Sequence, residues 1–260
     1  MKLDKVWEIA RKDMASVIKH KYVFYGLIGI PLIFAIFIPI TTIYPAVSGE
    51  EPSENELPPF APPGMAPKQA VVMGLVNMAI LMFMILPAVI PSTIASYTFV
   101  GEKVNRQLEP LLATPTSDFE LLIGKGLGAF VPAMVATIAS FAGLVVVVDL
   151  LTFQLFGHLI LPNLVSVVVL FIYAPLVCLL SVSWCIFISS KVNDVRAAMQ
   201  LGVLGIVPVL AFYFLFMGGL VSLEWPTLVV FGLLLASVSA SLFFLSRATF
   251  QREDILTKWK

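Results

Sequence analysis

Six long stretches of the sequence contain no Asp, Glu, Lys, Arg or His, and they constrain the fold more than any other feature. A helix needs about 20 apolar residues to cross about 30 Å of hydrocarbon. The second and fourth stretches are too long for one upright crossing and too short for two, so we expect them to tilt or to extend past the headgroups. Each stretch predicts one helical span, because lipid cannot satisfy an open backbone. The stretches are 23–44, 70–100, 126–148, 159–190, 197–221 and 226–246.

The composition agrees with an all-α membrane protein. Apolar residues make up 59% of the 260-residue chain, whereas charged residues make up 12%, about half of the ~25% usual in soluble proteins. The formal net charge is zero, so no basic excess exists to neutralise nucleic-acid phosphates. These values exclude a nucleic-acid partner and a disordered chain, and they predict that the lipid bilayer is the solvent.

The distribution of basic residues predicts the topology. Six crossings place both termini on one side of the membrane, and fifteen of the sixteen Lys and Arg residues then lie in the segments on that side. Only Lys68 lies in a segment on the other side. The positive-inside rule therefore predicts cytoplasmic N- and C-termini. We expect the multi-pass protein to lie in the plasma membrane.

The two ends of the chain lie outside the predicted six-span domain, 23–246. Residues 1–22 predict an amphipathic helix in the inner headgroup layer, and residues 247–260 form a cytoplasmic tail. A plain extension of the first span is the alternative for 1–22. The expected apolar face consists of Leu3, Val6, Trp7, Ala10, Met14, Val17 and Ile18, with Ile9 as an exception on the polar side.

The predicted spans lack the side chains of familiar chemistry. Ion-coupled carriers usually place acids, lysines or histidines inside the bundle, but none occurs within these six stretches. The chain has no Walker A loop, no HExxH helix and no GxSxG elbow, so we expect no enzyme and no cofactor bound by this chain. Gly124 and Gly128 instead form a small-residue pair suited to close helix packing, and Cys178 and Cys185 are expected to be buried apolar fillers.

The cytoplasmic segment 101–125 is more elaborate than a simple link between the second and third spans. Pro110 fits the first turn of a short helix, and Pro115 pushes Thr114 towards an extended conformation that ends it. Ser117-Asp118-Phe119-Glu120 has the form of a capping box that starts the third span. The short turn presents Leu108, Leu111 and Leu112 to water, which predicts that another surface covers them. Folding back onto the headgroups is the alternative.

These residues resemble the signature of ABC-2 type transporter permeases, the membrane subunits of one class of ABC exporters. The resemblance rests on LEPLLATPTS at 108–117, with Glu102 before it and Glu120 and Gly124-Lys125 after it. Trp7 with Lys12-Asp13, and residues 189–197, are also similar to that family. The segment departs from the family in carrying Arg106-Gln107 where Gly-Thr is usual.

The resemblance implies that the short turn is a coupling helix that docks on a separate cytosolic ATPase. It also implies a second permease copy, identical or paralogous, with the substrate path between the two, and ATP and Mg on the partner ATPase. A stand-alone carrier or channel, or a membrane assembly factor, both without an ATPase, are the alternatives. The residues implied in coupling are Glu102, Leu108, Glu109, Leu111, Leu112, Thr114 and Pro115.

The sequence does not identify a transported substrate. A path without charges suits a lipid-like or amphipathic compound, although ions, peptides and glycans stay open. Packing in lipid and hydrogen bonding to the backbone are the alternative roles for the polar and aromatic residues that could line the path. Those candidates are Asn77, Ser92, Thr93 and Ser96 in the second span and Phe212, Tyr213 and Phe216 in the fifth.

Overall fold

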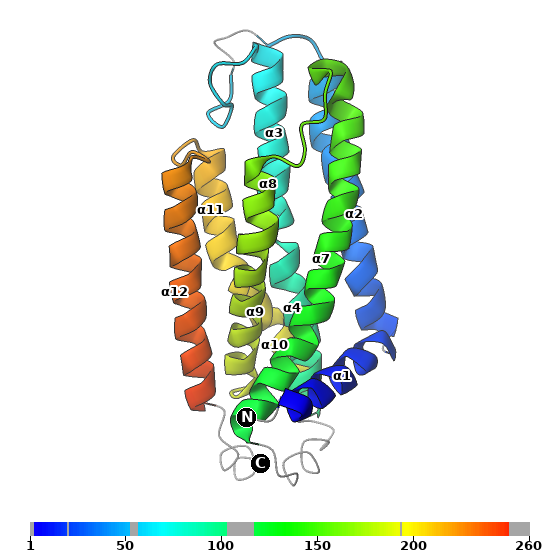
Figure 1. Cartoon of the computed structure of the whole chain (residues 1–260), viewed down its shortest axis with the longest axis vertical. Helices are drawn as coiled ribbons and strands as arrows, with labels where there is room; N and C mark the ends of the chain where they lie inside the picture. Colours follow the sequence, from blue (N-terminus) through cyan, green and yellow to red (C-terminus); the bar gives the residue numbers. More distant parts are fainter. Residues whose placement is uncertain (1–2, 20, 53–56, 103–116, 193, 250–260) are drawn as a thin grey trace.

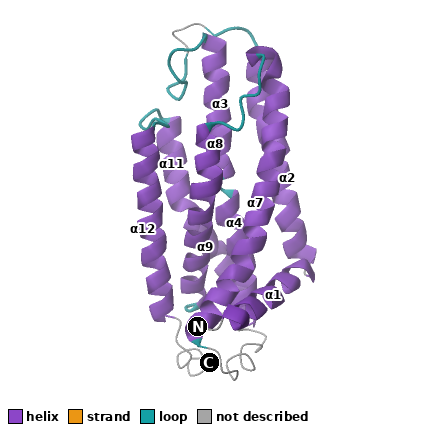
Figure 2. Cartoon of the chain, in the orientation of Figure 1, coloured by secondary structure: helices purple, strands orange, loops and turns teal. Residues whose placement is uncertain are grey.

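The computed structural model describes residues 3–19, 21–52, 57–102, 117–192 and 194–249. Every regular element in these ranges is a helix, and the helices form one elongated bundle (Figures 1 and 2). Six helical segments are long and apolar enough to cross a membrane, which confirms the predicted all-helical, multi-pass chain. They are Phe24–Ser48, Pro67–Gly101, Asp118–Phe156, Leu164–Ser189, Val195–Met217 and Trp225–Arg247.

The third span is much longer than the predicted 126–148. Helix α7 (Asp118–Phe156) has 39 residues, which corresponds to about 58 Å at 1.5 Å per residue. It begins at the Ser117 capping box, as predicted, and ends at Gly157, whose φ of 71° is a left-handed cap. Lys125 and Asp149, which flank the uncharged stretch 126–148, both lie inside this helix. Asp149 accepts hydrogen bonds from the amides of the following loop, those of Ile160 and Leu161.

The second span is interrupted. Helix α3 (Pro67–Phe83) ends just before Met84, and α4 (Leu86–Ser96) continues the crossing into the π-helical turn η2 (Tyr97–Gly101). Pro87 explains the break, because its ring nitrogen cannot donate a hydrogen bond to the carbonyl of Phe83.

The fourth and fifth spans also change helix type part-way. In the fourth, α8 (Leu164–Val168) passes through the π-turn η3 (Val169–Tyr173) into α9 (Ala174–Ser189). In the fifth, α10 (Val195–Gly202) passes through the 3-10 turn η4 (Val203–Ile206) into α11 (Val207–Met217). Each irregular turn precedes a proline, Pro175 or Pro208. Proline has no backbone N–H to donate to the carbonyl four residues earlier, as a regular helix requires. The sixth span is α12 (Trp225–Thr249).

The N-terminal helix lies across one end of the bundle. Helix α1 (Leu3–Lys19) packs obliquely against α7 and is followed by α2 (Lys21–Ser48), which rises along the bundle (Figure 1). We call this end, which also holds the start of α7 and the C-terminal end of α12, the α1 end. The face of this helix that packs on the bundle includes Ile9 with Val6 and Ala10, although Ile9 was expected on the polar side, and Trp7 is 56% exposed. The expected location of α1 in the headgroup layer stays a prediction.

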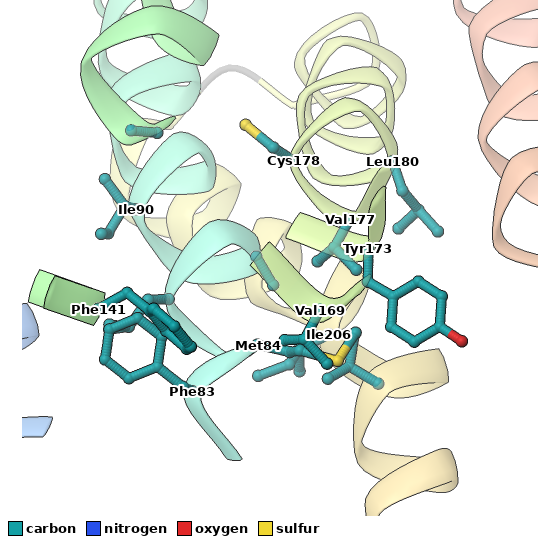
Figure 3. Close-up of a cluster of buried hydrophobic side chains, with 14 of the residues drawn as sticks. Phe83, Met84, Ile90, Phe141, Val169, Tyr173, Val177, Cys178, Leu180 and Ile206 are labelled. Carbon is teal, nitrogen blue, oxygen red and sulfur yellow. The ribbon is translucent and has the colours of Figure 1, made fainter. Parts of the chain in front are cut away.

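The bundle core is a continuous cluster of aliphatic and aromatic side chains from α1 and all six spans. Phe83 meets Phe141 edge to face, with ring centroids 5.3 Å apart (Figure 3). The hydroxyl of buried Tyr173 donates to the carbonyl of Leu228 at 2.6 Å, which ties the fourth span to the sixth. Cys178 and Cys185 are buried free thiols, as predicted. Packing with few polar groups is expected here, because a polar group without a partner is costly in a lipid-facing bundle.

At the opposite end, the link between the first two spans folds back onto the helices. Phe60 packs against Phe216 and lies over Gly74, where an added Cβ would come within 2.8 Å of the Phe60 ring. Pro59 covers Gly219, whose φ is +70°. The two glycines therefore leave room for the 57–61 part of the link.

Candidate functional site

A buried lysine is the main polar feature of the α1 end. The side chain of Lys125, in the second turn of α7, is 0% exposed. Its Nζ lies 3.2 Å from Oδ2 of Asp13 on α1 and 2.5 Å from Oε2 of Glu102 after η2. A charge removed from water needs partners of opposite sign with good hydrogen-bond geometry. Lys125 therefore joins α1, the end of the second span and the start of the third.

The π-turn provides the third oxygen partner. The amide of Glu102 donates to the carbonyl of Phe99 rather than to that of Thr98. The Thr98 carbonyl accepts a hydrogen bond from Lys125 Nζ at 3.3 Å, and the ammonium lies 5.4 Å from the centroid of the Phe99 ring. Such local departures from α-helical bonding frequently mark functional sites.

A second lysine extends the cluster to the surface. Nζ of Lys12 lies 2.9 Å from Oε1 of Glu102, so this carboxylate bridges two ammonium groups. The side chain of Lys12 is 51% exposed. Two lysines and two carboxylates give a cluster without net charge, and only one of its members reaches solvent freely.

The two carboxylates differ in their proton affinity. Burial raises the pKa of Asp13 above its ordinary value, and the attraction of Lys125 offsets only part of this effect. Burial also acts on Glu102, but there the attraction of Lys125 and the hydrogen bonds from Lys125 and Lys12 prevail and lower its pKa. The difference follows from the number of cations, since Glu102 contacts two and Asp13 one.

Close approach of α1 to α7 makes the cluster possible. A Cβ added at Gly124 would come within 2.9 Å of Ile9 Cβ and 3.0 Å of the Val6 carbonyl oxygen. A Cβ added at Gly128 would lie 2.8 Å from Asp13 Cβ. The predicted small-residue pair is thus used for close packing, and its partner is α1.

The cluster and the capping box flank segment 103–116 on its two sides. The Ser117 hydroxyl accepts from the amide of Glu120, and the Glu120 carboxylate accepts from the amide of Ser117. Phe119 packs edge to face on Phe243 of α12, and the guanidinium of Arg247 lies 5.1 Å from the centroid of its ring. Of the residues implied in coupling, Glu102 is therefore in the cluster. Leu108, Glu109, Leu111, Leu112, Thr114 and Pro115 lie outside the described residues.

The residues proposed for a substrate path are dispersed through the bundle. The Ser92 hydroxyl donates to the Val89 carbonyl and the Thr93 hydroxyl donates to the same oxygen. Ser92 and Ser96 are buried beside Gly202 of α10, whereas Thr93 faces a hollow between α2 and α4. Asn77 lies on α3 and its Oδ1 is buried without a hydrogen-bond partner in the described chain.

The aromatic candidates of the fifth span do not form one surface either. Phe212 stacks on Phe231 with centroids 3.8 Å apart, and Phe216 lies under Phe60. Tyr213 is half-buried and meets the exposed ring of Phe214. Their part in a substrate path stays a prediction.

Sequence reasoning missed the centre of this site. Lys125 was assigned to the cytoplasmic segment before the third span, and Asp13 was noted only as part of a family-like dipeptide, so neither was expected to be buried. The available signal was the position of Asp13, because it follows Val6, Ile9 and Ala10 at helical spacing on the face that the structure buries. Within the described ranges, no group of three His, Cys, Asp or Glu side chains could hold a metal ion.

Comparison of the chain with protein-family models and with curated proteins finds no match to either. The assignment of a function therefore depends on the sequence motif and on the geometry of the α1 end.

Proposed function

We propose that this chain is the membrane-spanning permease subunit of an ATP-driven transporter of the ABC-2 type, and that it exports a substrate across the plasma membrane. A separate cytosolic ATPase supplies ATP hydrolysis, with ATP and Mg bound on that partner. A second permease copy, identical or paralogous, completes the substrate path. The permease itself has no catalytic role.

The observation that supports this proposal most is the fixation of both flanks of segment 103–116. Glu102 precedes the segment and is paired with Lys125, which lies eight residues after its other flank, Ser117. Lys125 is in turn paired with Asp13 of α1. A force applied to a turn between these flanks would therefore reach the second span, the third span and α1 together. This is the mechanical requirement for a coupling element.

The internal neutrality of the cluster bears on the alternatives. An ion-coupled carrier needs a buried group that gains and loses charge during the cycle. Here the charges of Lys125 and Lys12 are neutralised by those of Asp13 and Glu102. This neutrality favours a structural role for the cluster, in which it holds the helices together. A stand-alone carrier or channel and an assembly factor stay as alternatives, and both differ from the proposal in needing no ATPase.

The test is purification of the protein from its native membrane under mild conditions. The proposal expects a cytosolic ATPase to co-purify in roughly equal amount, and it expects the isolated permease to hydrolyse no ATP. Robust flux through the permease alone, driven only by an ion gradient, would overturn the proposal in favour of the carrier.

A further inference from the structure

A hollow lies between α1, α2 and α7, above the ion cluster. It encloses about 500 Å³ and is almost wholly apolar. Val17 of α1, Leu27 of α2 and Ala139 of α7 are among the residues that line it. It opens to the outside of the bundle, because the lining residues Leu32 and Val135 are exposed.

The small residues of α7 explain why this space exists. They continue from Gly124 and Gly128 at intervals of four residues through Pro132, Ala136 and Ser140. α1 packs against the two glycines, whereas the last three residues line the hollow. Over this stretch the small residues of α7 face the hollow, with residues of α2 on its other side.

The position of α1 restricts what can occupy the hollow. Met14 and Val17 of α1 close it on the side of the α1 end. A second membrane-spanning helix, about 10–12 Å wide, would have to displace α1 to run along α7 there. The Asp13–Lys125 pair holds α1 in place. A single acyl chain is narrower and flexible, and an apolar space facing lipid does not stay empty, since its lining would lose dispersion contacts.

The charge of α1 indicates which headgroup would accompany the chain. Over residues 11–19, the exposed charged side chains are Arg11, Lys12 and Lys19, and of these Lys12 is paired with Glu102. The acid in this stretch, Asp13, is buried and paired with Lys125. Basic residues beside a membrane attract anionic lipids. The half of α1 that borders the hollow therefore presents positive charge to the headgroup layer in which we expect it to lie.

We propose that the hollow is a binding site for one acyl chain of an anionic phospholipid, whose headgroup lies over residues 11–19 of α1. The lipid contacts α1, α2 and α7 at once and so stabilises the packing of α1 beside the ion cluster. This inference requires no ATPase and is independent of transport.

The experiment compares lipid retention in detergent by native mass spectrometry, using phosphatidylglycerol and phosphatidylcholine with the same acyl chains. The wild type should retain one phosphatidylglycerol in preference to phosphatidylcholine. Ala139→Phe fills the hollow and should weaken retention about tenfold, an effect of about 1.4 kcal/mol. Val146→Phe, on the exposed face of α7 outside the hollow, is the matched control and should change nothing. Ala139→Leu gives a second, smaller filling variant, and melting curves establish that each variant is folded.

A paired substitution tests the headgroup. Arg11→Gln with Lys19→Gln should remove the preference for phosphatidylglycerol, whereas Arg196→Gln on α10 should keep it. Equal retention by Ala139→Phe and Val146→Phe would overturn the acyl-chain site. Loss of a dimer in Ala139→Phe with lipid retention unchanged would assign the hollow to a second copy instead. Equal retention of the two lipids by the wild type would overturn the anionic headgroup.

Discussion

Lys125 Nζ lies 3.2 Å from a carboxylate oxygen of Asp13, across 112 residues of sequence, and the two side chains are 0% and 1% exposed. The pair fixes α1, which precedes the first span, to the start of the third. Because neither group reaches water, Asp13 depends on Lys125 for electrostatic compensation, and Lys125 depends on Asp13 together with Glu102.

Breaking this pair should destabilise the fold strongly. Lys125→Met leaves the Asp13 and Glu102 carboxylates without their shared cation, and we expect a loss of about 3–5 kcal/mol in the free energy of unfolding. Asp13→Asn combined with Lys125→Met should cost less than the sum of the single variants, because the double variant leaves no isolated charge at this contact. Chemical denaturation of the wild type, the two single variants and the double variant in detergent measures these free energies.

Lys12→Met is the control for the exposed side of the same cluster. Its side chain is half exposed, so we expect a loss of at most about 1 kcal/mol in the free energy of unfolding. Losses of equal size for Lys12→Met and Lys125→Met would contradict the account of a buried pair.

The two carboxylates should give opposite pH dependences of stability. The raised pKa of Asp13 means that the folded state holds its proton longer, so its contribution falls as the pH rises from the ordinary value of 3.8 through the folded pKa. The lowered pKa of Glu102 means that its contribution is full above the ordinary value of 4.5 and is lost as the pH falls through the folded pKa. Melting temperatures across the acid range measure both. Asp13→Asn should remove the first trend and Glu102→Gln the second, and a variant that leaves the profile unchanged would contradict the assignment.

Substitution of the glycines that contact α1 should weaken its packing. Gly124→Ala would place a methyl group against Ile9 and the Val6 carbonyl, and Gly128→Ala would place one against Asp13. We expect each to cost about 1–3 kcal/mol through overpacking. Gly126→Ala, on the same helix, meets only Val182 at 3.6 Å, which is an ordinary contact, and should be tolerated. Protease protection of α1 together with thermal melting distinguishes the variants.

Residue patterns predicted the architecture because each span is long and free of charge, and because the capping box at Ser117 is a strictly local signal. They failed where a charge is buried by its partners. A count of uncharged residues excludes Lys125 from the buried part of the third span, yet its side chain is buried because Asp13 and Glu102 neutralise the ammonium. The burial of Ile9 was missed for a related reason, because Ile9 packs against Gly124, which lies 115 positions away in the sequence. Such pairings depend on which helices meet.

The topology can be tested by cysteine labelling. Glu51 and Lys191 are exposed at opposite ends of the bundle, the second at the α1 end. The distribution of basic residues places Glu51 outside and Lys191 in the cytoplasm. In intact cells, an impermeant thiol reagent should label Glu51→Cys and should label Lys191→Cys only after the membrane is opened. Labelling of both variants in intact cells would contradict the six-span orientation.

Docking of segment 103–116 on an ATPase is tested most directly by a substitution at Leu112. Leu112→Asp places a charge where the proposal expects an apolar groove of the partner. Loss of a central interface side chain can cost about 2.7 kcal/mol, which is about a hundredfold in affinity. Leu57→Asp, a partly exposed leucine at the opposite end, is the matched control.

The measurement is a pull-down of the ATPase by each permease variant, with a melting curve recorded in parallel. We expect Leu112→Asp to lose the ATPase while its melting temperature stays close to that of the wild type, and we expect Leu57→Asp to keep both the ATPase and the melting temperature. Full retention of the ATPase by Leu112→Asp, or a collapse of its melting temperature, would contradict docking at this segment.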